Sequence, residues 1–99
     1  MPYEIVFARE TREHLEWLSA RQRAIVLNAV AEQLAHQPSV ETRNRKPLRP
    51  NELADWELRV GRLRVYYDVS DQPEPVVRVK AVGIKEREQV WIGGKVVRL

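Results

Sequence analysis

The sequence contains no cysteine. This absence excludes a disulfide framework, a thiol nucleophile and a cysteine-ligated zinc site. Only two histidines are present, His14 and His36, and they are far apart in the chain. Glycine is also scarce, and no glycine-rich phosphate-binding loop or metal-ligand spacing can be recognised. We therefore expect no metal and no other cofactor, and any catalysis has to rest on Arg, Lys, Tyr, Trp and carboxylate side chains.

Long apolar runs are absent as well. No stretch reaches the roughly 18 consecutive apolar residues of a membrane-spanning helix. Residues Met1–Glu4 lack the basic and apolar segments of a secretory signal. We expect a cytoplasmic protein without a membrane partner, folded as one domain over residues 1–99. The formal net charge of +3 permits an acidic partner such as nucleic acid but does not require one.

The second half of the chain carries the most informative pattern. Three short segments alternate apolar and polar residues, which is the period of a half-buried strand. They are Trp56–Val60, Leu63–Val69 and Val76–Val82, and Gly61-Arg62 predicts a tight hairpin between the first two. We expect an antiparallel meander with one apolar face, formed by Trp56, Leu58, Val60, Leu63, Val65, Tyr67, Val69, Val77, Val79 and Ala81.

The opposite face of this predicted sheet is polar. It carries Glu57, Arg59, Arg64, Tyr66, Asp68, Arg78 and Lys80. Alternation alone favours an ordinary solvated face with cross-strand ion pairs. A cationic face with an aromatic side chain also suits contacts with phosphates and bases. The basic loop before the sheet, which includes Lys46 and Arg49, adds weight to nucleic-acid binding because it leads directly into this face.

The first half of the chain predicts a strand and a helical hairpin. Residues 3–7 alternate like a strand, whereas residues 11–19 and 21–36 have helical spacing. In the second helix we expect an apolar stripe of Ala24, Leu27, Val30, Ala31 and Leu34. Trp17 is expected to pack between the two helices.

The end of the chain is less regular. Residues 84–91 are charged and predict a short helix, Gly93-Gly94 ends it, and residues 95–99 suit an extended segment. Prolines at 38, 47 and 50 exclude a regular helix or a central strand from residues 37–53. The expected fold is α+β, with an N-terminal strand and helical hairpin packed on an antiparallel sheet in the order β-α-α-β-β-β, followed by a short C-terminal helix and tail.

Two runs in the second half resemble a known family. Residues 56–69 are similar to the central hairpin of RelE/ParE superfamily toxins of type II toxin–antitoxin systems. Residues 79–88 are similar to their last core strand and the basic turn after it, and Pro47-Leu48 also fits. The resemblance, which favours the RelE-like members, spans nearly the whole chain and implies one toxin domain.

The resemblance implies the toxin of a toxin–antitoxin pair, with a cognate antitoxin protein as partner. RelE-like members occupy the ribosomal A site and cut mRNA, as the 2′-hydroxyl attacks the adjacent phosphate. Cationic side chains stabilise the developing negative charge, and an aromatic ring stacks on a base. ParE-like members share the fold but inhibit DNA gyrase without catalysis, and this is the alternative activity. A third possibility is a domain that only binds an antitoxin.

The resemblance also implies roles for individual residues. Arg64 matches the hairpin arginine of RelE-like nucleases, Lys85 falls where they have an arginine, and Trp91 falls where they have a tyrosine. Asp55 and Glu57 replace lysines of the nucleases, and Glu57 could serve as a base. The expected catalytic set is Arg64, Lys85 and Glu57. The expected RNA-binding set is Arg59, Tyr66, Arg78, Lys80, Arg87, Trp91, Lys46 and Arg49.

Overall fold

The computed structural model describes residues 2–99. Its elements are β1 (Glu4–Phe7), α1 (Thr11–Glu16), α2 (Ala20–Leu34), β2 (Arg45–Pro47), β3 (Trp56–Val60), β4 (Leu63–Ser70), β5 (Val76–Glu86), β6 (Gln89–Ile92) and β7 (Lys95–Val97). Within this part of the chain the strands form one seven-stranded sheet in the order β2-β3-β4-β5-β6-β7. β1 is added beside β5 and runs parallel to it, while the other neighbours are antiparallel.

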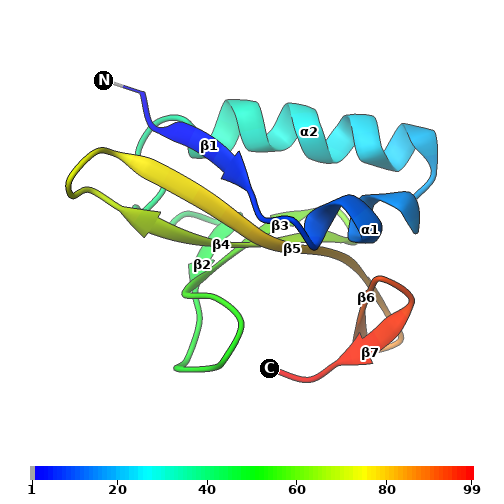
Figure 1. The fold of residues 1–99 in the computed structure, drawn as a ribbon. Helices are drawn as coiled ribbons and strands as arrows, with labels where there is room; N and C mark the ends of the chain where they lie inside the picture. The colour runs from blue at the N-terminus through cyan, green and yellow to red at the C-terminus, as the bar shows by residue number, and fades with distance from the viewer. Residues whose placement is uncertain (1) are drawn as a thin grey trace.

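The sheet separates two different layers (Figure 1). α1 and α2 cover one face, and the loop between β2 and β3 lies with the β6–β7 hairpin on the other. The main core is formed between helices and sheet by Leu18, Val26, Val30, Leu34, Leu58, Leu63, Val65, Tyr67, Val77, Val79 and Val82. Burying such side chains stabilises the fold by about 25 cal/mol per Å² of apolar surface. The α+β architecture expected from the sequence is thus confirmed.

The helical hairpin packs on the sheet through a stripe that shares only Val30 and Leu34 with the predicted one. Val26, Val30 and Leu34 are buried, whereas Leu27 is 46% exposed. Apolar residues occur around much of α2, so helical spacing alone could not choose between the two stripes. The predicted position of Trp17 between the helices is also wrong. Trp17 is 65% exposed, and its ring covers Gly94.

A bulge in β5 changes which residues face the helices. Tyr66 lies opposite Ala81, but the next residue, Tyr67, lies opposite Val79. Lys80 is therefore an extra residue in β5, and side chains beyond it are shifted to the other face. Ala81, predicted on the helix-facing side, packs with Tyr66 on the opposite side, while Val82 joins the main core.

The predicted helix at residues 84–91 is wrong, because this segment forms a β-hairpin. β5 continues to Glu86, and β6 pairs with it from Gln89 onward. The chain reverses at Arg87 and Glu88, which have φ angles of 52° and 68°. Two consecutive positive φ angles are typical of a tight hairpin turn, but such turns usually contain Gly, Asn or Asp. The extended segment predicted after Gly94 is present as β7.

A buried arginine attaches the loop after α2 to the helical layer. Arg45 begins β2 and is only 9% exposed. Its guanidinium donates to the carbonyl oxygens of Val40 at 3.0 Å and Gln33 at 2.9 Å, which satisfies a cation in the interior. Within residues 2–99, β2 pairs with β3 alone, so Pro47 is accommodated in an edge strand. None of the helices in residues 2–99 has the length and apolar character needed to span a membrane.

Candidate functional site

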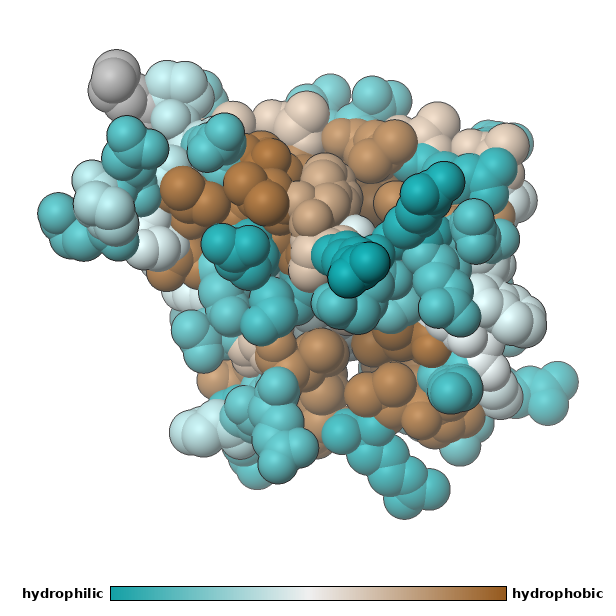
Figure 2. Space-filling model, viewed as in Figure 1, coloured by the Kyte–Doolittle hydropathy of each residue, from teal (hydrophilic) through white to brown (hydrophobic). Residues whose placement is uncertain are grey.

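A cleft of about 510 Å³ lies on the sheet face away from the helices. Its floor is formed by β3 and β4, and the β6–β7 hairpin and C-terminal tail form one wall. Figure 2 shows apolar side chains on both sides of the gap between the β2–β3 loop and the β6–β7 hairpin. The cleft is lined by Leu48, Glu57, Arg59, Arg64, Tyr66, Lys85, Glu88, Gln89, Val90, Val96, Val97, Arg98 and Leu99.

Strand pairing explains why the polar side chains meet on the floor of the cleft. Glu57 lies opposite Tyr66, and Arg59 lies opposite Arg64, across β3 and β4. Side chains two residues apart on one strand share a face, so these four form a compact square. The structure therefore brings together the three predicted catalytic residues, since Lys85 of β5 lines the same cleft.

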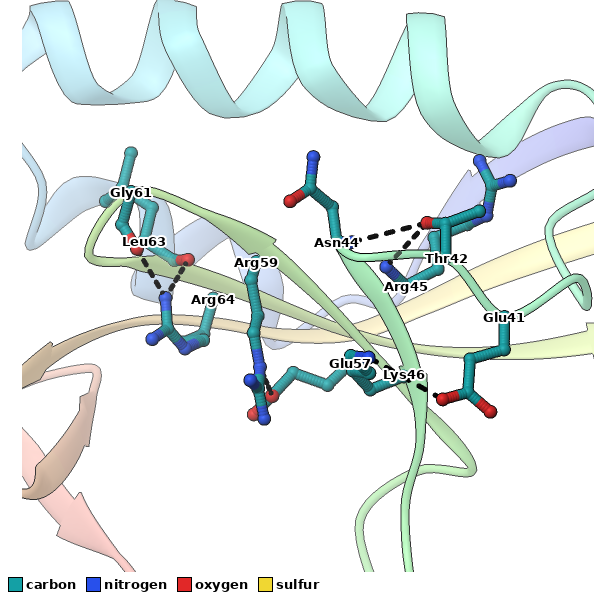
Figure 3. Close-up of polar contacts among 10 residues, drawn as sticks. All are labelled: Glu41, Thr42, Asn44, Arg45, Lys46, Glu57, Arg59, Gly61, Leu63 and Arg64. Atoms are coloured by element: carbon teal, nitrogen blue, oxygen red, sulfur yellow. Dashed lines mark hydrogen bonds and ion pairs between the residues drawn. The ribbon is translucent and has the colours of Figure 1, made fainter.

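Glu57 is the buried carboxylate of this square. Its side chain is 10% exposed, and its Oε1 accepts a hydrogen bond from Arg59 Nε at 2.7 Å (Figure 3). A buried charge requires such a partner, because it has lost its hydration. The Arg59 side chain is 49% exposed, so one partner of this ion pair is buried and the other is accessible from the cleft.

Arg64 is held by backbone carbonyls. Its NH1 donates to the oxygens of Gly61 at 2.7 Å and Leu63 at 2.9 Å (Figure 3). Neither Arg64 nor Lys85 takes part in an ion pair with any of residues 2–99. Four cationic side chains line the cleft against two side-chain carboxylates, which leaves an excess of two positive side-chain charges. The cleft is thus suited to an anion such as a phosphodiester.

Tyr66 does not occupy the exposed position expected of a base-stacking residue. It is 0% exposed and belongs to a second apolar cluster with Ala54, Ala81 and Ile92. The β2–β3 loop and the β6–β7 hairpin cover this part of the sheet, which alternation within β4 could not reveal. Burial, and then the charge of Glu57, raise the pKa of the Tyr66 hydroxyl well above its usual value.

Trp91 lies away from the cleft. It is 37% exposed and lines a separate hollow of about 330 Å³ with His14 and Trp17. His14 Nδ1 accepts a hydrogen bond from the Val82 N–H at 3.4 Å. Burial lowers the pKa of His14, although Glu13 and Glu10 oppose this shift. His14 is therefore a structural contact between α1 and β5.

The other predicted RNA-binding residues are dispersed. Arg78 lines a different hollow beside Asp68, and Lys80 pairs with Asp68 at 3.7 Å. Lys46 pairs with Glu41 at 3.6 Å. Arg49 and Arg87 are exposed on a loop and a turn. Only five of the eleven predicted site residues line the cleft: Glu57, Arg59, Arg64, Tyr66 and Lys85.

Two charged residues of the cleft were missed by the sequence analysis. Arg98 of the tail and Glu88 of the β5–β6 turn both line it. No motif marks either residue, and both reach the cleft only because residues 84–97 fold back as hairpins. No group of three His, Cys, Asp or Glu side chains in the described part of the chain could hold a metal ion.

Comparison with known proteins shows a likeness to a solved structure. No family model matches the chain, and no curated protein sequence does so. Among solved structures, the chain is similar to a chain of the toxin–antitoxin complex RelBE2 from Mycobacterium tuberculosis. The TM-score is 0.73 and the sequence identity is 27%, over 86% of this chain and 100% of that chain.

Proposed function

We propose that this chain, a RelE-like protein of the RelE/ParE superfamily, is the toxin of a type II toxin–antitoxin system and cleaves mRNA on the ribosome. Its RelE-like character was predicted from the sequence and is confirmed by the likeness to the RelBE2 chain. The observation that carries the proposed activity is the cleft, which Arg59, Arg64 and Lys85 line together with Glu57.

The proposed reaction uses these groups in distinct roles. Glu57 accepts the proton of a ribose 2′-hydroxyl, and the 2′-oxygen attacks the adjacent phosphorus. The bond from phosphorus to the 5′-oxygen breaks, and the leaving oxygen takes a proton from water. The products are a 2′,3′-cyclic phosphate and a 5′-hydroxyl. Arg64 and Lys85 stabilise the negative charge that develops on the phosphoryl oxygens.

The fixed position of Arg64 supports this assignment. Donors stabilise a transition state most when they need no reorganisation as charge develops. Two carbonyl oxygens hold the Arg64 guanidinium at the edge of the cleft, and an arginine has five N–H donors in all. The remaining donors can therefore serve a phosphate without releasing these two contacts.

A cognate antitoxin is the proposed protein partner. The similar chain belongs to a complex of toxin and antitoxin, and an uncontrolled nuclease of mRNA would harm its own cell. The positive excess of the cleft suits an acidic, extended antitoxin segment. Its complex should weaken as salt rises, because exposed charges are screened over ~8 Å at physiological ionic strength.

The test is cleavage by the purified protein in a reconstituted translation system, with mRNA ends mapped and gyrase supercoiling measured in parallel. The matched variants are Arg64→Ala and Arg78→Ala, since Arg64 was expected to be catalytic and Arg78 to bind RNA, but only Arg64 lines the cleft. We expect ribosome-dependent cuts that Arg64→Ala abolishes and Arg78→Ala preserves. Inhibition of gyrase without any mRNA cleavage would replace this function with the ParE-like one.

A further inference from the structure

We propose that Tyr66 is a positioning residue for Glu57: its hydroxyl becomes the hydrogen-bond donor of the Glu57 carboxylate when a substrate phosphate draws Arg59 away. This inference rests on the proposed nuclease function. The Tyr66 ring is buried and cannot stack on a base, so this inference assigns the residue a different role.

The first observation is an unsatisfied hydroxyl. The Tyr66 oxygen is buried and has no hydrogen-bond partner among residues 2–99. Buried polar atoms of native proteins are nearly always hydrogen-bonded, so an exception needs a physical explanation. Burial in the second apolar cluster alone would favour phenylalanine at this position, since the hydroxyl loses water and gains nothing.

The second observation is the location of Glu57. It lies directly opposite Tyr66 in the β3–β4 pair, where side chains are close neighbours. Within the described residues, only Arg59 donates to its carboxylate. After the larger effect of burial, the charge of Glu57 and the approach of its carboxylate to the hydroxyl raise the pKa of Tyr66, so the two groups lie close together although no hydrogen bond of normal geometry joins them. The phenol therefore stays protonated at neutral pH and can donate but cannot act as a base.

These two observations are linked by Arg59. Its guanidinium holds Glu57 Oε1 at 2.7 Å, yet the side chain is half exposed to the cleft. An incoming phosphodiester competes with Glu57 for this cation. Once Arg59 has moved to the phosphate, Glu57 would be a buried charge without a hydrogen-bond partner, which is costly. A hydrogen bond from Tyr66 offsets this cost and keeps the carboxylate oriented toward the 2′-hydroxyl.

The adjacent residue supplies a matched control. Tyr67 is also 0% exposed, but its side chain faces the main core, and its hydroxyl donates to the Pro38 oxygen at 2.8 Å. Tyr66→Phe and Tyr67→Phe therefore remove the same atom from two buried tyrosines of one strand. One hydroxyl is unpaired beside the cleft, and the other is paired away from it.

The experiment measures cleavage kinetics and thermal unfolding of both variants. Tyr66→Phe should lower kcat by roughly 10- to 100-fold, the loss expected for a hydrogen bond to a charged group, with little change in KM. It should leave the melting temperature equal or higher, because it deletes an unsatisfied polar atom. Tyr67→Phe should do the reverse, lowering the melting temperature while kcat is retained.

The pH profile separates positioning from packing. Losing the Tyr66 donor removes a hydrogen bond to the ionised base of the substrate complex, so the acidic limb of the kcat profile should shift to higher pH. In a Glu57→Gln background, Tyr66→Phe should have no further effect on kcat. A change in the profile must not arise from the other charged groups that face Glu57. These groups are Lys46, Arg59, Arg64, Lys85, Glu88 and Arg98.

The outcomes distinguish this inference from the proposed function. If the wild-type protein cleaves mRNA and Tyr66→Phe matches its kcat and pH profile, the positioning role is wrong and the nuclease function stands. If Tyr66→Phe lowers kcat and melting temperature together without a pH shift, the hydroxyl is structural. A wild-type protein that cleaves no mRNA overturns both.

Discussion

Arg59 and Arg64 lie directly opposite each other across β3 and β4, on the floor of the same cleft. Like charges at directly opposed positions destabilise an antiparallel pair. The fold offsets this cost in two ways, with the Glu57 carboxylate bound to Arg59 and backbone carbonyls bound to Arg64. The result is a concentration of positive charge that an anionic ligand can relieve, which links the local instability to binding.

Replacing Arg64 tests this relationship. Arg64→Ala should reduce the rate of mRNA cleavage by ~10²–10³, as when a donor to a developing oxyanion is removed. It should not lower the free energy of unfolding, because it also removes the repulsion with Arg59. Cleavage rates and denaturant unfolding of the same preparations check both parts. A variant that cleaves at the wild-type rate would exclude Arg64 from the reaction, and an unfolded variant would show a structural role instead.

The structure places Trp91 elsewhere than the sequence-based expectation did. The resemblance predicted a base-stacking residue, whereas the ring lies at a different hollow beside His14. Trp91→Ala should therefore leave mRNA cleavage unchanged and lower stability by ~1–2 kcal/mol, because its ring is partly buried. Trp17→Ala is the control, as that ring is more exposed and should cost less. A large fall in cleavage by a stably folded Trp91→Ala would restore the stacking role.

The alternation of β3 and β4 was sufficient to predict much of the cleft floor. A strand has a period of two residues, so Glu57, Arg59 and Arg64 had to share a face once the hairpin turn at Gly61 was recognised. That expectation is met in the strand register. Trp56 is on the predicted core side too, where it is half-buried and stacks on Tyr67 with ring centroids 6.2 Å apart.

The remaining features depend on contacts that alternation does not encode. The Lys80 bulge inverts the faces of β5 without a glycine or proline to mark it. The turn at Arg87 and Glu88 uses residues that rarely adopt positive φ, so the β5–β6 hairpin had no sequence signal. Because β6 and β7 cover Tyr66 together with the β2–β3 loop, the burial of Tyr66 and its unpaired hydroxyl could only emerge from the tertiary structure.

His14 makes stability depend on pH. Its pKa in the fold is lowered from the ordinary value of 6.5, so the folded state favours the neutral ring. The unfolded chain binds more protons as pH falls below this value, and stability is therefore present at neutral pH and lost on acidification. Unfolding free energies measured from pH 8 to pH 5 should fall less steeply for His14→Gln than for wild type. His36→Gln, at an exposed position, should keep the wild-type slope; equal slopes for all three would contradict this assignment.

Gly83 is the position at which β5 can bear no side chain. A Cβ atom there would lie 2.5 Å from the Trp91 backbone oxygen and 2.8 Å from Ile92 Cγ1, so Gly83→Ala must push β6 away from β5. We expect a loss of ~1–3 kcal/mol from overpacking, together with slower cleavage, because β6 carries one wall of the cleft. Gly61→Ala is the control: its φ of +59° strains alanine, but no atom lies within 4 Å. That variant should lose about 1–2 kcal/mol from backbone strain alone and retain its cleavage rate once stability is matched. If Gly83→Ala melted and cleaved like wild type, the close packing of β6 on β5 would be incorrect, and the cleft wall would have to be formed in another way.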